Sequence, residues 1–344
     1  MKAAVLKAPG ILELDDLLDL ECPKGGALIE VKACSVCGTD VKMLQKGHKD
    51  LVYPRILGHE IVGEIAEIDQ ECDIIEGDLV QVWPGIACGV CRPCLRGNDN
   101  QCMSMKILGF NRDGGFAELV ALPKESISRG MNLIDRLSPG LDVISLAEPL
   151  ACCLNGQELT AVSEGDVVLI IGGGPIGCLH AALAELRGAE KIIVAEKLEN
   201  RIGIIKRHTA CRVLDTSETL LEAIYEETRR KGVDVIMMAT PEVKIDNSLL
   251  RLLAPGGRIC IFSGPRIGDY EETIDVRSVH YRELTIVGAY GCSSRQNKQV
   301  AQLLASGALD VDWIITKRTT LENIWGALDH SSERRGLKAV IDGV

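Results

Sequence analysis

The central part of the chain alternates between two hydrophobic periods. Residues 166–171 form a run of apolar β-formers, and residues 176–186 then place apolar side chains at helical spacing. A second apolar run follows at 191–196. Short continuous apolar runs are typical of buried strands, and the period between them is that of an α-helix. The pattern therefore predicts one strand–helix–strand unit over 166–196.

Three glycines interrupt this unit where the first strand passes into the helix. Gly172, Gly174 and Gly177 form the pattern G-x-G-x-x-G. The first makes the tight turn, the second lets the backbone approach a pyrophosphate, and the third lets the helix pack on the strand. The free N–H groups and the positive dipole end at the helix N-terminus favour the phosphates. Because the motif is in register with both strands, it predicts a dinucleotide-binding Rossmann unit.

An acidic residue occupies the position expected to meet the ribose of the dinucleotide. Glu196 ends the second strand, 19 positions after Gly177. A carboxylate there accepts hydrogen bonds from a ribose diol and repels a 2′-phosphate, which favours NAD over NADP. Two alternatives stay open. Glu196 can be a solvated strand end, and the basic Lys197 and Arg201 can serve a 2′-phosphate.

The flanking sequence has two distinct patterns. Before about residue 148, short alternating runs are separated by Gly, Pro and Asp turns, which predicts a β-rich region with strands at 27–33, 61–68 and 79–82. Beyond it, further strands are expected at 212–214, 234–239, 258–263, 284–289 and 337–341, with helices near 198–208, 218–230, 243–253 and 296–306. The six strands between residues 166 and 289, with their intervening helices, form a doubly wound parallel sheet, so the fold class is α/β.

Composition excludes several functional classes. The chain has 344 residues, 46% hydrophobic and 25% charged, which is typical of a soluble globular protein long enough for two domains. Its formal net charge of −11 argues against nucleic acid or an anionic membrane as a partner. No apolar run reaches the length of a membrane span, and the N-terminal stretch lacks signal-peptide features, so we expect a cytoplasmic protein. Its 14 cysteines then indicate metal ligands or buried thiols.

Four of the cysteines lie close together on a loop rich in Gly, Pro and Asn. Cys88, Cys91, Cys94 and Cys102 have the spacing C-x2-C-x2-C-x7-C, which suits a tetrahedral zinc site. The set contains no histidine, no carboxylate and no open position, which favours a structural role. An iron–sulfur cluster also stays open, although ferredoxin runs continue with x3-C-P, whereas here the gap is seven residues. The sequence also allows four free thiols.

A second set of potential ligands is spread over three places. Cys37 lies in CSVCGTD, His59 and Glu60 lie in GHEIVGEI, and Glu148 lies in AEPLACC. Catalytic zinc takes three protein ligands plus a water or substrate oxygen, and Cys37, His59 and one carboxylate meet that need. Taken singly, each has a plainer explanation: a buried thiol, a core histidine, or a glutamate in the first turn of a helix. Cys34, which forms C-x2-C with Cys37, is expected to be a buried thiol.

The motifs occur in an order that resembles one family. The order is CGTD around Cys37, GHE at 58–60, the cysteine-rich loop at 88–102, RDGGFAELVALP at 112–123, EP at 148–149 and GGGPIG at 172–177. The chain is similar to zinc-dependent medium-chain dehydrogenases. Within them it resembles the sorbitol/polyol and threonine dehydrogenase branch more than the liver-type alcohol dehydrogenases. The resemblance covers nearly the whole chain, up to GLKAVI at 336–341.

The resemblance implies two domains. A GroES-like catalytic domain would span residues 1–146 and be rejoined by 289–344, and a Rossmann NAD-binding domain would span 147–288. The active site would lie at their junction, and the run at 337–341 would return to the first domain. The resemblance also implies a homodimer or homotetramer, with 284–289 as an edge strand that joins two Rossmann sheets.

The resemblance also assigns site residues. Cys37, His59 and Glu148 match the catalytic zinc ligands. Glu60 matches a neighbouring glutamate that ligates in some states or lies just outside the ligand shell, and Thr39 matches the hydroxyl that passes on the substrate proton. The expected cofactor-binding positions are Gly172, Gly174, Pro175, Ile176, Gly177, Glu196 and Arg201.

The implied reaction is hydride transfer between an alcohol and NAD. Zinc would lower the pKa of the substrate hydroxyl, Thr39 would take its proton, and the hydride would pass to the nicotinamide. One position departs from the family pattern: Lys42 stands where a histidine often relays the proton to solvent. The relay is therefore expected to run through ribose hydroxyls to Lys42, to another group, or directly to water.

The expected substrate is a secondary alcohol, or its ketone, of a polyol, sugar or sugar-derived compound. Residues 42–55 carry four Lys or Arg residues against one acid, which indicates an anionic or heavily hydroxylated substrate, or else a solvated charged face. L-Threonine and a sugar phosphate such as galactitol 1-phosphate are alternative substrates. The sequence also leaves open a zinc-free quinone or enoyl reductase of the same superfamily, and a protein that kept the fold without the activity.

Overall fold

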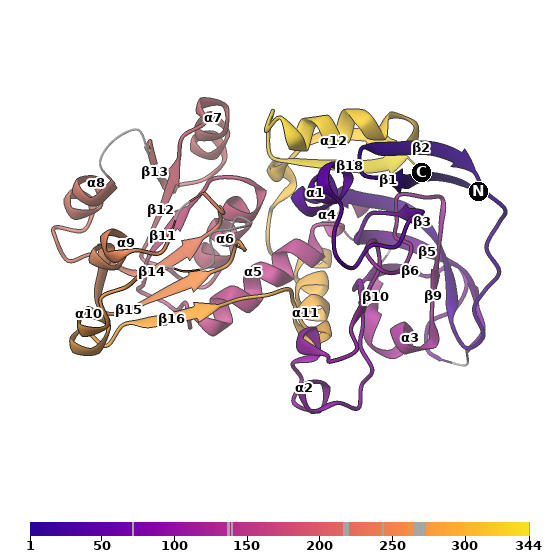
Figure 1. Ribbon diagram of the computed structural model, residues 1–344, viewed down its shortest axis with the longest axis horizontal. Coiled ribbons are helices and arrows are strands. Elements are labelled where there is room, and N and C mark those ends of the chain that lie inside the picture. The colour runs from indigo at the N-terminus through magenta and orange to yellow at the C-terminus, as the bar shows by residue number, and fades with distance from the viewer. Residues whose placement is uncertain are drawn as a thin grey trace. The chain divides into compact units, whose positions relative to one another are not determined.

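The structure is a computed structural model that describes residues 1–70, 72–135, 138, 140–215, 220–242, 244–264, 271 and 273–343. Contacts within the chain divide it into two compact units (Figure 1). The first unit comprises Met1–Ala151 and Cys292–Val344, and the second comprises Cys152–Gly291. The domain boundaries expected at 146 and 289 stay a prediction, because units defined by contacts need not fold independently.

The first unit is built on a seven-stranded sheet. Its strands follow the order β10, β6, β5, β3, β18 and β17, and β9 also pairs with β3. Their bounds are β3 Ala27–Val36, β5 Glu60–Ile68, β6 Leu79–Val82, β9 Leu119–Leu122, β10 Met131–Ile134, β17 Ile315–Thr320 and β18 Lys338–Gly343. Because β18 pairs antiparallel with β3, the end of the chain returns to a strand near its beginning.

Smaller elements complete the first unit. A three-stranded sheet contains β1 Lys2–Ala8, β2 Ile11–Asp16 and β4 Arg55–Ile56, and a two-stranded one contains β7 Gly85–Ile86 and β8 Lys106–Ile107. The helices are α1 Gly38–Lys46, α2 Arg92–Leu95, α3 Lys124–Gly130, α4 Leu141–Ile144, α11 Ser294–Ala305 and α12 Ile324–Ser332, with 3₁₀ turns at Asp99–Gln101, Asp312–Ile314 and Leu321–Asn323. Helix α5, Ala147–Leu159, runs on into the second unit.

The packing around β3 and β5 determines where the predicted ligands lie. Buried side chains of these strands form one hydrophobic cluster with those of β1, β6, β9 and α12. Gly58 has φ +90°, and a Cβ there would lie 2.7 Å from Phe116 Cδ1 and 2.9 Å from Cys34 Sγ. Only glycine fits this close approach. The core therefore sets the position of His59 and Glu60, which follow at the start of β5.

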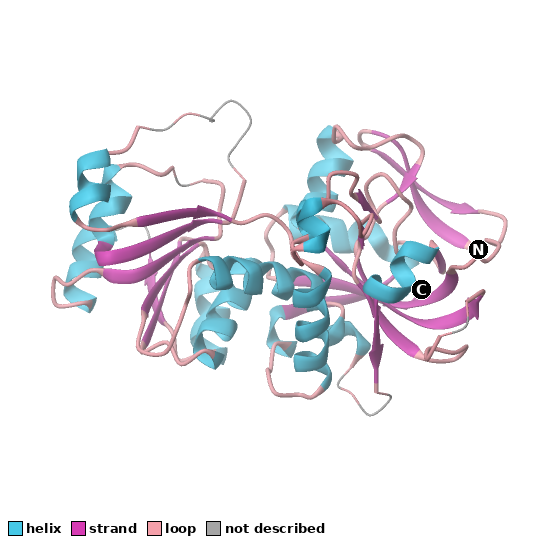
Figure 2. Cartoon of the chain, turned by 90° about the horizontal axis from the view of Figure 1, so that it is seen from below, coloured by secondary structure: helices cyan, strands magenta, loops and turns pink. Residues whose placement is uncertain are grey.

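The second unit is a six-stranded sheet in which every pair of strands is parallel. Its order is β13 Arg212–Asp215, β12 Lys191–Glu196, β11 Val167–Ile171, β14 Val233–Met238, β15 Leu253–Ile261 and β16 Thr285–Gly288. The helices are α6 Pro175–Leu186, α7 Glu199–His208, α8 Leu220–Glu227, α9 Asn247–Leu252 and α10 Val276–Tyr281, and they flank the sheet (Figure 2). This is the doubly wound Rossmann order, so the predicted α/β fold is confirmed.

The observed elements differ from the predicted ones mainly at their ends. Strand β15 begins at Leu253 rather than at 258, because its first residue already pairs with Val233 across a register shift. Helix α9 begins at Asn247, because the Asp246 carboxylate accepts hydrogen bonds from the N–H groups of Ser248 and Leu249. The helix starts predicted at 218 and 243 lie outside the described residues. Within the described ranges, no helix is both long and apolar enough to cross a membrane.

A substitution at Gly177 tests the turn between β11 and α6. A Cβ at Gly177 would lie 1.8 Å from the carbonyl oxygen of Gly172. We expect Gly177→Ala to lower the free energy of unfolding by about 1–3 kcal/mol or more, because backbone must move. In the control Gly203→Ala, on α7, the nearest atom is Arg207 Nη1 at 3.8 Å, and better helix propensity should add about 1 kcal/mol. Urea unfolding followed by circular dichroism measures both, and equal stability of the two variants would contradict the described turn.

Candidate functional site

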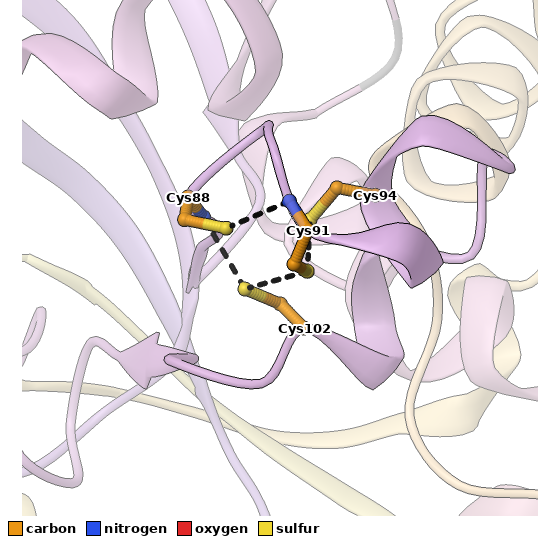
Figure 3. Close-up of side chains that lie close together, drawn as sticks. All are labelled: Cys88, Cys91, Cys94 and Cys102. Carbon is orange, nitrogen blue, oxygen red and sulfur yellow. Dashed lines mark hydrogen bonds between the residues drawn. The ribbon is translucent and has the colours of Figure 1, made fainter.

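The four cysteines predicted to bind a structural metal converge in space. Their sulfur atoms all lie within 4.8 Å of one another, with Cys91 Sγ 3.4 Å from Cys94 Sγ and 3.9 Å from Cys102 Sγ (Figure 3). Tetrahedral zinc with Zn–S bonds of about 2.3 Å holds its sulfurs about 3.8 Å apart, so the donor set fits the ion. The set contains only thiols, which leaves no open position. Cys88, Cys91, Cys94 and Cys102 are thus a structural zinc site.

Backbone hydrogen bonds favour the thiolate form of two of the four cysteines, which is the form that binds a metal cation. Hydrogen bonds from the backbone N–H groups of Val90 and Cys91 lower the pKa of Cys88 to about 6. Backbone N–H groups likewise lower the pKa of Cys91. Burial instead raises the pKa of Cys94 to about 12. A bound metal cation offsets the cost of deprotonating the buried Cys94 thiol, because cysteine binds metals as the thiolate.

One carboxylate fastens this loop to the rest of the first unit. Asp99, which is 2% exposed, accepts hydrogen bonds from Ser294 N at 2.9 Å and Ser294 Oγ at 2.5 Å. Ser294 is the first residue of α11, so the loop supplies an anion to the N-terminus of a helix. Arg129 Nη1 lies 4.0 Å from the same carboxylate. The metal loop and α11 therefore support each other.

The second predicted set forms around the start of α1. Cys37 follows β3 and caps the helix: its Sγ accepts a hydrogen bond from Thr39 N at 3.4 Å, and its own N–H donates to Asp40 Oδ2 at 2.9 Å. This reciprocal cap holds the Cys37 side chain at the end of the helix where N–H dipoles favour negative charge. The Thr39 side chain lies in the same first turn and is half-buried.

His59 is held by a buried carboxylate. Its Nδ1 lies 3.2 Å from Asp40 Oδ1, and both side chains are almost fully removed from water. Burial opposes protonation of His59, but the neighbouring Asp40 carboxylate and Cys37 sulfur outweigh it and raise the pKa of His59 well above its usual value. A carboxylate on one ring nitrogen with a metal on the other is the arrangement that orients zinc-bound histidines.

Glu60 completes a three-ligand set. One Glu60 carboxylate oxygen, the Cys37 sulfur and a His59 ring nitrogen lie within 4.8 Å of one another. The carboxylate accepts hydrogen bonds from Ser35 Oγ and, at 2.6 Å, from Lys338 Nζ. Burial opposes the charge on Lys338, but Glu60 and Cys37 outweigh it and raise its pKa, so Lys338 is a cation. A thiol, an imidazole and a carboxylate at this spacing fit a catalytic zinc ion.

Glu148, the second carboxylate predicted as a ligand, lies in the first turn of α5. It does not belong to the three-residue set around Cys37 within the described part of the chain. Its assignment as a zinc ligand therefore stays a prediction. Sequence reasoning missed Asp40, Ser35 and Lys338; of these, Asp40 could have been found, because it lies three residues after Cys37 in the spacing of a helix cap.

The glycine-rich loop of the second unit has the geometry of a phosphate-binding turn. Gly172 has φ +102°, Gly174 precedes α6 as its N-cap, and Pro175 is the first helical residue. A Cβ at Gly174 would lie 3.2 Å from Arg201 Nη1, so this guanidinium lies against the loop. Ile176 follows at the start of the helix, half-buried. Backbone N–H groups and a cation thus meet where a pyrophosphate is expected.

Glu196 lies at the end of β12, as predicted, but its carboxylate already accepts hydrogen bonds from the backbone. Oε2 accepts a hydrogen bond from Gly173 N at 2.9 Å, and Oε1 accepts from Lys197 N at 2.7 Å and Leu198 N at 3.0 Å. A carboxylate offers about four acceptor sites, so capacity for a ribose hydroxyl remains. Arg201 Nη1 lies 4.0 Å from Oε2. Glu196 therefore also ties the strand end to the glycine-rich loop.

Family models match both units. Residues 23–131 match the alcohol dehydrogenase GroES-like domain, and residues 175–306 match the zinc-binding dehydrogenase model. The first match covers the four-cysteine loop and the Cys37, His59 and Glu60 set. The second begins at the glycine-rich loop. The GroES-like and Rossmann parts of the predicted fold are therefore confirmed.

Individual relatives match nearly the whole chain. A D-altritol 5-dehydrogenase of Agrobacterium fabrum is 31% identical over 310 residues, 89% of this chain and 87% of that protein. An L-threonine 3-dehydrogenase of Streptomyces coelicolor is 30% identical over 349 residues, 99% of each. A solved zinc-binding dehydrogenase of Sinorhizobium meliloti 1021 bound to NADP has a TM-score of 0.89 at 29% identity, covering 99% of this chain and 98% of that one.

Removal of the Asp99 carboxylate tests the attachment of the metal loop. We expect Asp99→Ala to lower the free energy of unfolding by about 1–3 kcal/mol, because it leaves the Ser294 donors unpaired. Hydrogen exchange should rise in the first turn of α11, and the cysteine-bound metal should pass faster to a chelator. Asp73→Ala, at an exposed site, is the control. Exchange in α11 equal to that of the control would show that Asp99 does not link the two elements.

Proposed function

The chain belongs to the zinc-containing medium-chain alcohol dehydrogenase family, and on that premise we propose that it interconverts a secondary alcohol of a polyol or sugar-derived substrate and its ketone, with NAD as the hydride carrier. As a member of that family it is a zinc-dependent, NAD(P)-linked alcohol or polyol dehydrogenase. The observation that carries the proposal is the convergence of Cys37, His59 and Glu60 beside the buried Asp40. A zinc-free reductase of the same superfamily would have no use for such a set.

The residues around this set have distinct roles in the proposed reaction. Cys37, His59 and a carboxylate from Glu60 or Glu148 would hold a zinc ion, which would supply the Lewis acidity that lowers the pKa of a substrate hydroxyl. Asp40 keeps the His59 ring oriented and in the tautomer that leaves its other nitrogen free to bind a metal.

Thr39 is the proposed group that takes the substrate proton. Its hydroxyl is carried by the first turn of α1, two residues after Cys37, where it can accept a proton from an alcohol bound next to that ligand while it passes its own proton on. Lys42 follows one turn later and is exposed, so the proton can pass from the buried end of α1 toward water along one face of the helix.

Two ion pairs favour NAD over NADP. Lys197 Nζ pairs with a Glu242 oxygen at 2.5 Å, and Arg201 Nη1 lies 4.0 Å from Glu196. Both cations near the expected ribose position therefore already face carboxylates. A 2′-phosphate would have to displace those partners and approach the Glu196 charge, which costs electrostatic energy.

The substrate class follows from the charge on and after α1. Arg55 pairs with Asp113 at 2.7 Å, so one of the four basic residues of 42–55 is neutralised. Lys42, Lys46 and Lys49 are exposed, which fits a hydroxyl-rich or anionic substrate. Relatives named for D-altritol and for L-threonine have similar identities. We therefore propose polyols as the first candidate substrates, and L-threonine and sugar phosphates as the second.

A substrate panel tests the proposal. The purified protein is assayed with NAD against polyols, sugar acids, the matching polyol phosphates and L-threonine. We expect the highest kcat/KM on a polyol with a secondary hydroxyl. A clear preference for a polyol phosphate over its free polyol would move the assignment to a sugar-phosphate dehydrogenase, and turnover of L-threonine alone would overturn the polyol assignment.

A single substitution tests the cofactor assignment. We expect Glu196→Ser to shift the ratio of kcat/KM for NAD to that for NADP toward NADP by about tenfold or more, because the repelling carboxylate is removed while Lys197 and Arg201 remain. Glu199→Ser, in the exposed first turn of α7, is the control and should leave the ratio unchanged. A wild-type enzyme that prefers NADP would refute the assignment.

A further inference from the structure

Both oxygens of the Glu60 carboxylate are engaged by buried donors. Oε1 accepts a hydrogen bond from Lys338 Nζ at 2.6 Å, and Oε2 accepts one from Ser35 Oγ. Glu60 and Ser35 are 0% exposed, and Lys338 is 4% exposed. Water therefore does not compete for this carboxylate, and the pair is a fully buried ion pair with an added hydrogen bond.

The sheet holds the two donors in place. Ser35 lies directly opposite Glu60 in the β3–β5 ladder and opposite Val340 in the β18–β3 ladder. Lys338 is the first residue of β18. Thr316 Oγ1 accepts a hydrogen bond from Leu337 N at 2.8 Å and donates one to the Lys338 carbonyl at 3.4 Å. Lys338 therefore approaches Glu60 from a strand that is anchored on both sides.

The same carboxylate is within reach of Cys37 and His59, the two remaining ligands of the set. One of its oxygens lies within 4.8 Å of both the Cys37 sulfur and a His59 ring nitrogen. Zinc and a lysine ammonium both bind a carboxylate through its oxygen lone pairs, so they compete for Glu60. The balance between them decides whether this carboxylate occupies a coordination position.

We propose that Lys338 is a positioning residue that, together with Ser35, holds Glu60 back from the metal at Cys37 and His59, so that Glu148, the other predicted carboxylate ligand, completes the three protein ligands and a fourth position stays available to a substrate oxygen. The inference rests on the proposed function, since only a reaction at the metal needs that position. Lys338 does not touch the reacting atoms and acts only through Glu60.

The test follows the ligands of a reporter metal. Co²⁺ replaces zinc at the Cys37 site, with zinc left in the four-cysteine loop, because the visible absorption of Co²⁺ changes with the number and type of its ligands. Three variants are compared with the wild type: Lys338→Met, Glu60→Gln and the double variant. Chelator competition gives the affinity of each for Co²⁺.

We expect Lys338→Met to release Glu60 onto the metal. Its Co²⁺ spectrum should change, its affinity for Co²⁺ should rise by about tenfold or more, and kcat should fall. Glu60→Gln alone should leave the wild-type spectrum nearly unchanged, and the double variant should resemble Glu60→Gln. Lys338→Arg, which keeps the cation, should retain the wild-type spectrum. A merely structural role for Lys338 would not reproduce this pattern.

The opposite pattern would overturn the inference. If Glu60→Gln alone changes the spectrum while Lys338→Met does not, Glu60 is already a ligand and Lys338 does not restrain it. Should Lys338→Met fail to fold, Ser35→Ala removes the second restraint, and it should shift the spectrum and the affinity in the same direction but by less. An unchanged spectrum in Ser35→Ala would then refute the proposal.

These readouts separate the restraint of Glu60 by Lys338 and Ser35, here called the clamp, from the proposed reaction. The Co²⁺ spectra and affinities need no substrate. If they follow the expected pattern while no alcohol is turned over, the proposed function fails and the clamp on Glu60 stands. If an alcohol is turned over while the spectra follow the opposite pattern, the function stands and the clamp fails.

Discussion

Buried charge where β3, α1 and β5 meet is the constraint on which the first unit depends. Asp40, Glu60 and Lys338 are almost entirely removed from water. Removing an ion from water costs several kcal/mol unless a partner compensates it, so each charge needs a neighbour within hydrogen-bond reach. His59 provides that neighbour for Asp40, and Lys338 provides it for Glu60. Strand β18 therefore has to lie beside β3, because it brings the compensating cation from the far end of the chain.

The four-cysteine loop also depends on charged and metal-binding groups more than on apolar packing. It exposes apolar side chains at Val90, Leu95 and Met103 instead of burying them, so little hydrophobic core holds it together. Its order comes from the metal ligands and from the Asp99 carboxylate at the start of α11. The Rossmann unit, by contrast, is held by an apolar sheet core, and its binding turn depends on glycines that allow backbone atoms to approach closely.

The patterns that sequence reasoning captured are local ones. The strand–helix–strand unit at 166–196, the spacing of the four cysteines and the GHE motif at 58–60 each lie within a few dozen residues, and the structure contains all three. Lys338 could not be found in this way, because its partner Glu60 is 278 positions away and only the β18–β3 pairing brings them together. The use of Glu196 by three backbone N–H groups was also missed, since it depends on the exact path of the loop after β12.

The number of zinc ions per chain shows whether Cys37 and His59 bind a catalytic zinc ion separate from the four-cysteine site. Elemental analysis of the protein purified without added metal should give about two zinc ions per chain, as four-cysteine structural sites and three-ligand catalytic sites each hold one. Cys37→Ser should reduce that number to one and abolish alcohol oxidation, while the four-cysteine site stays filled. One zinc per chain in the wild type, or two in Cys37→Ser with activity retained, would rule out a separate catalytic zinc ion at Cys37 and His59.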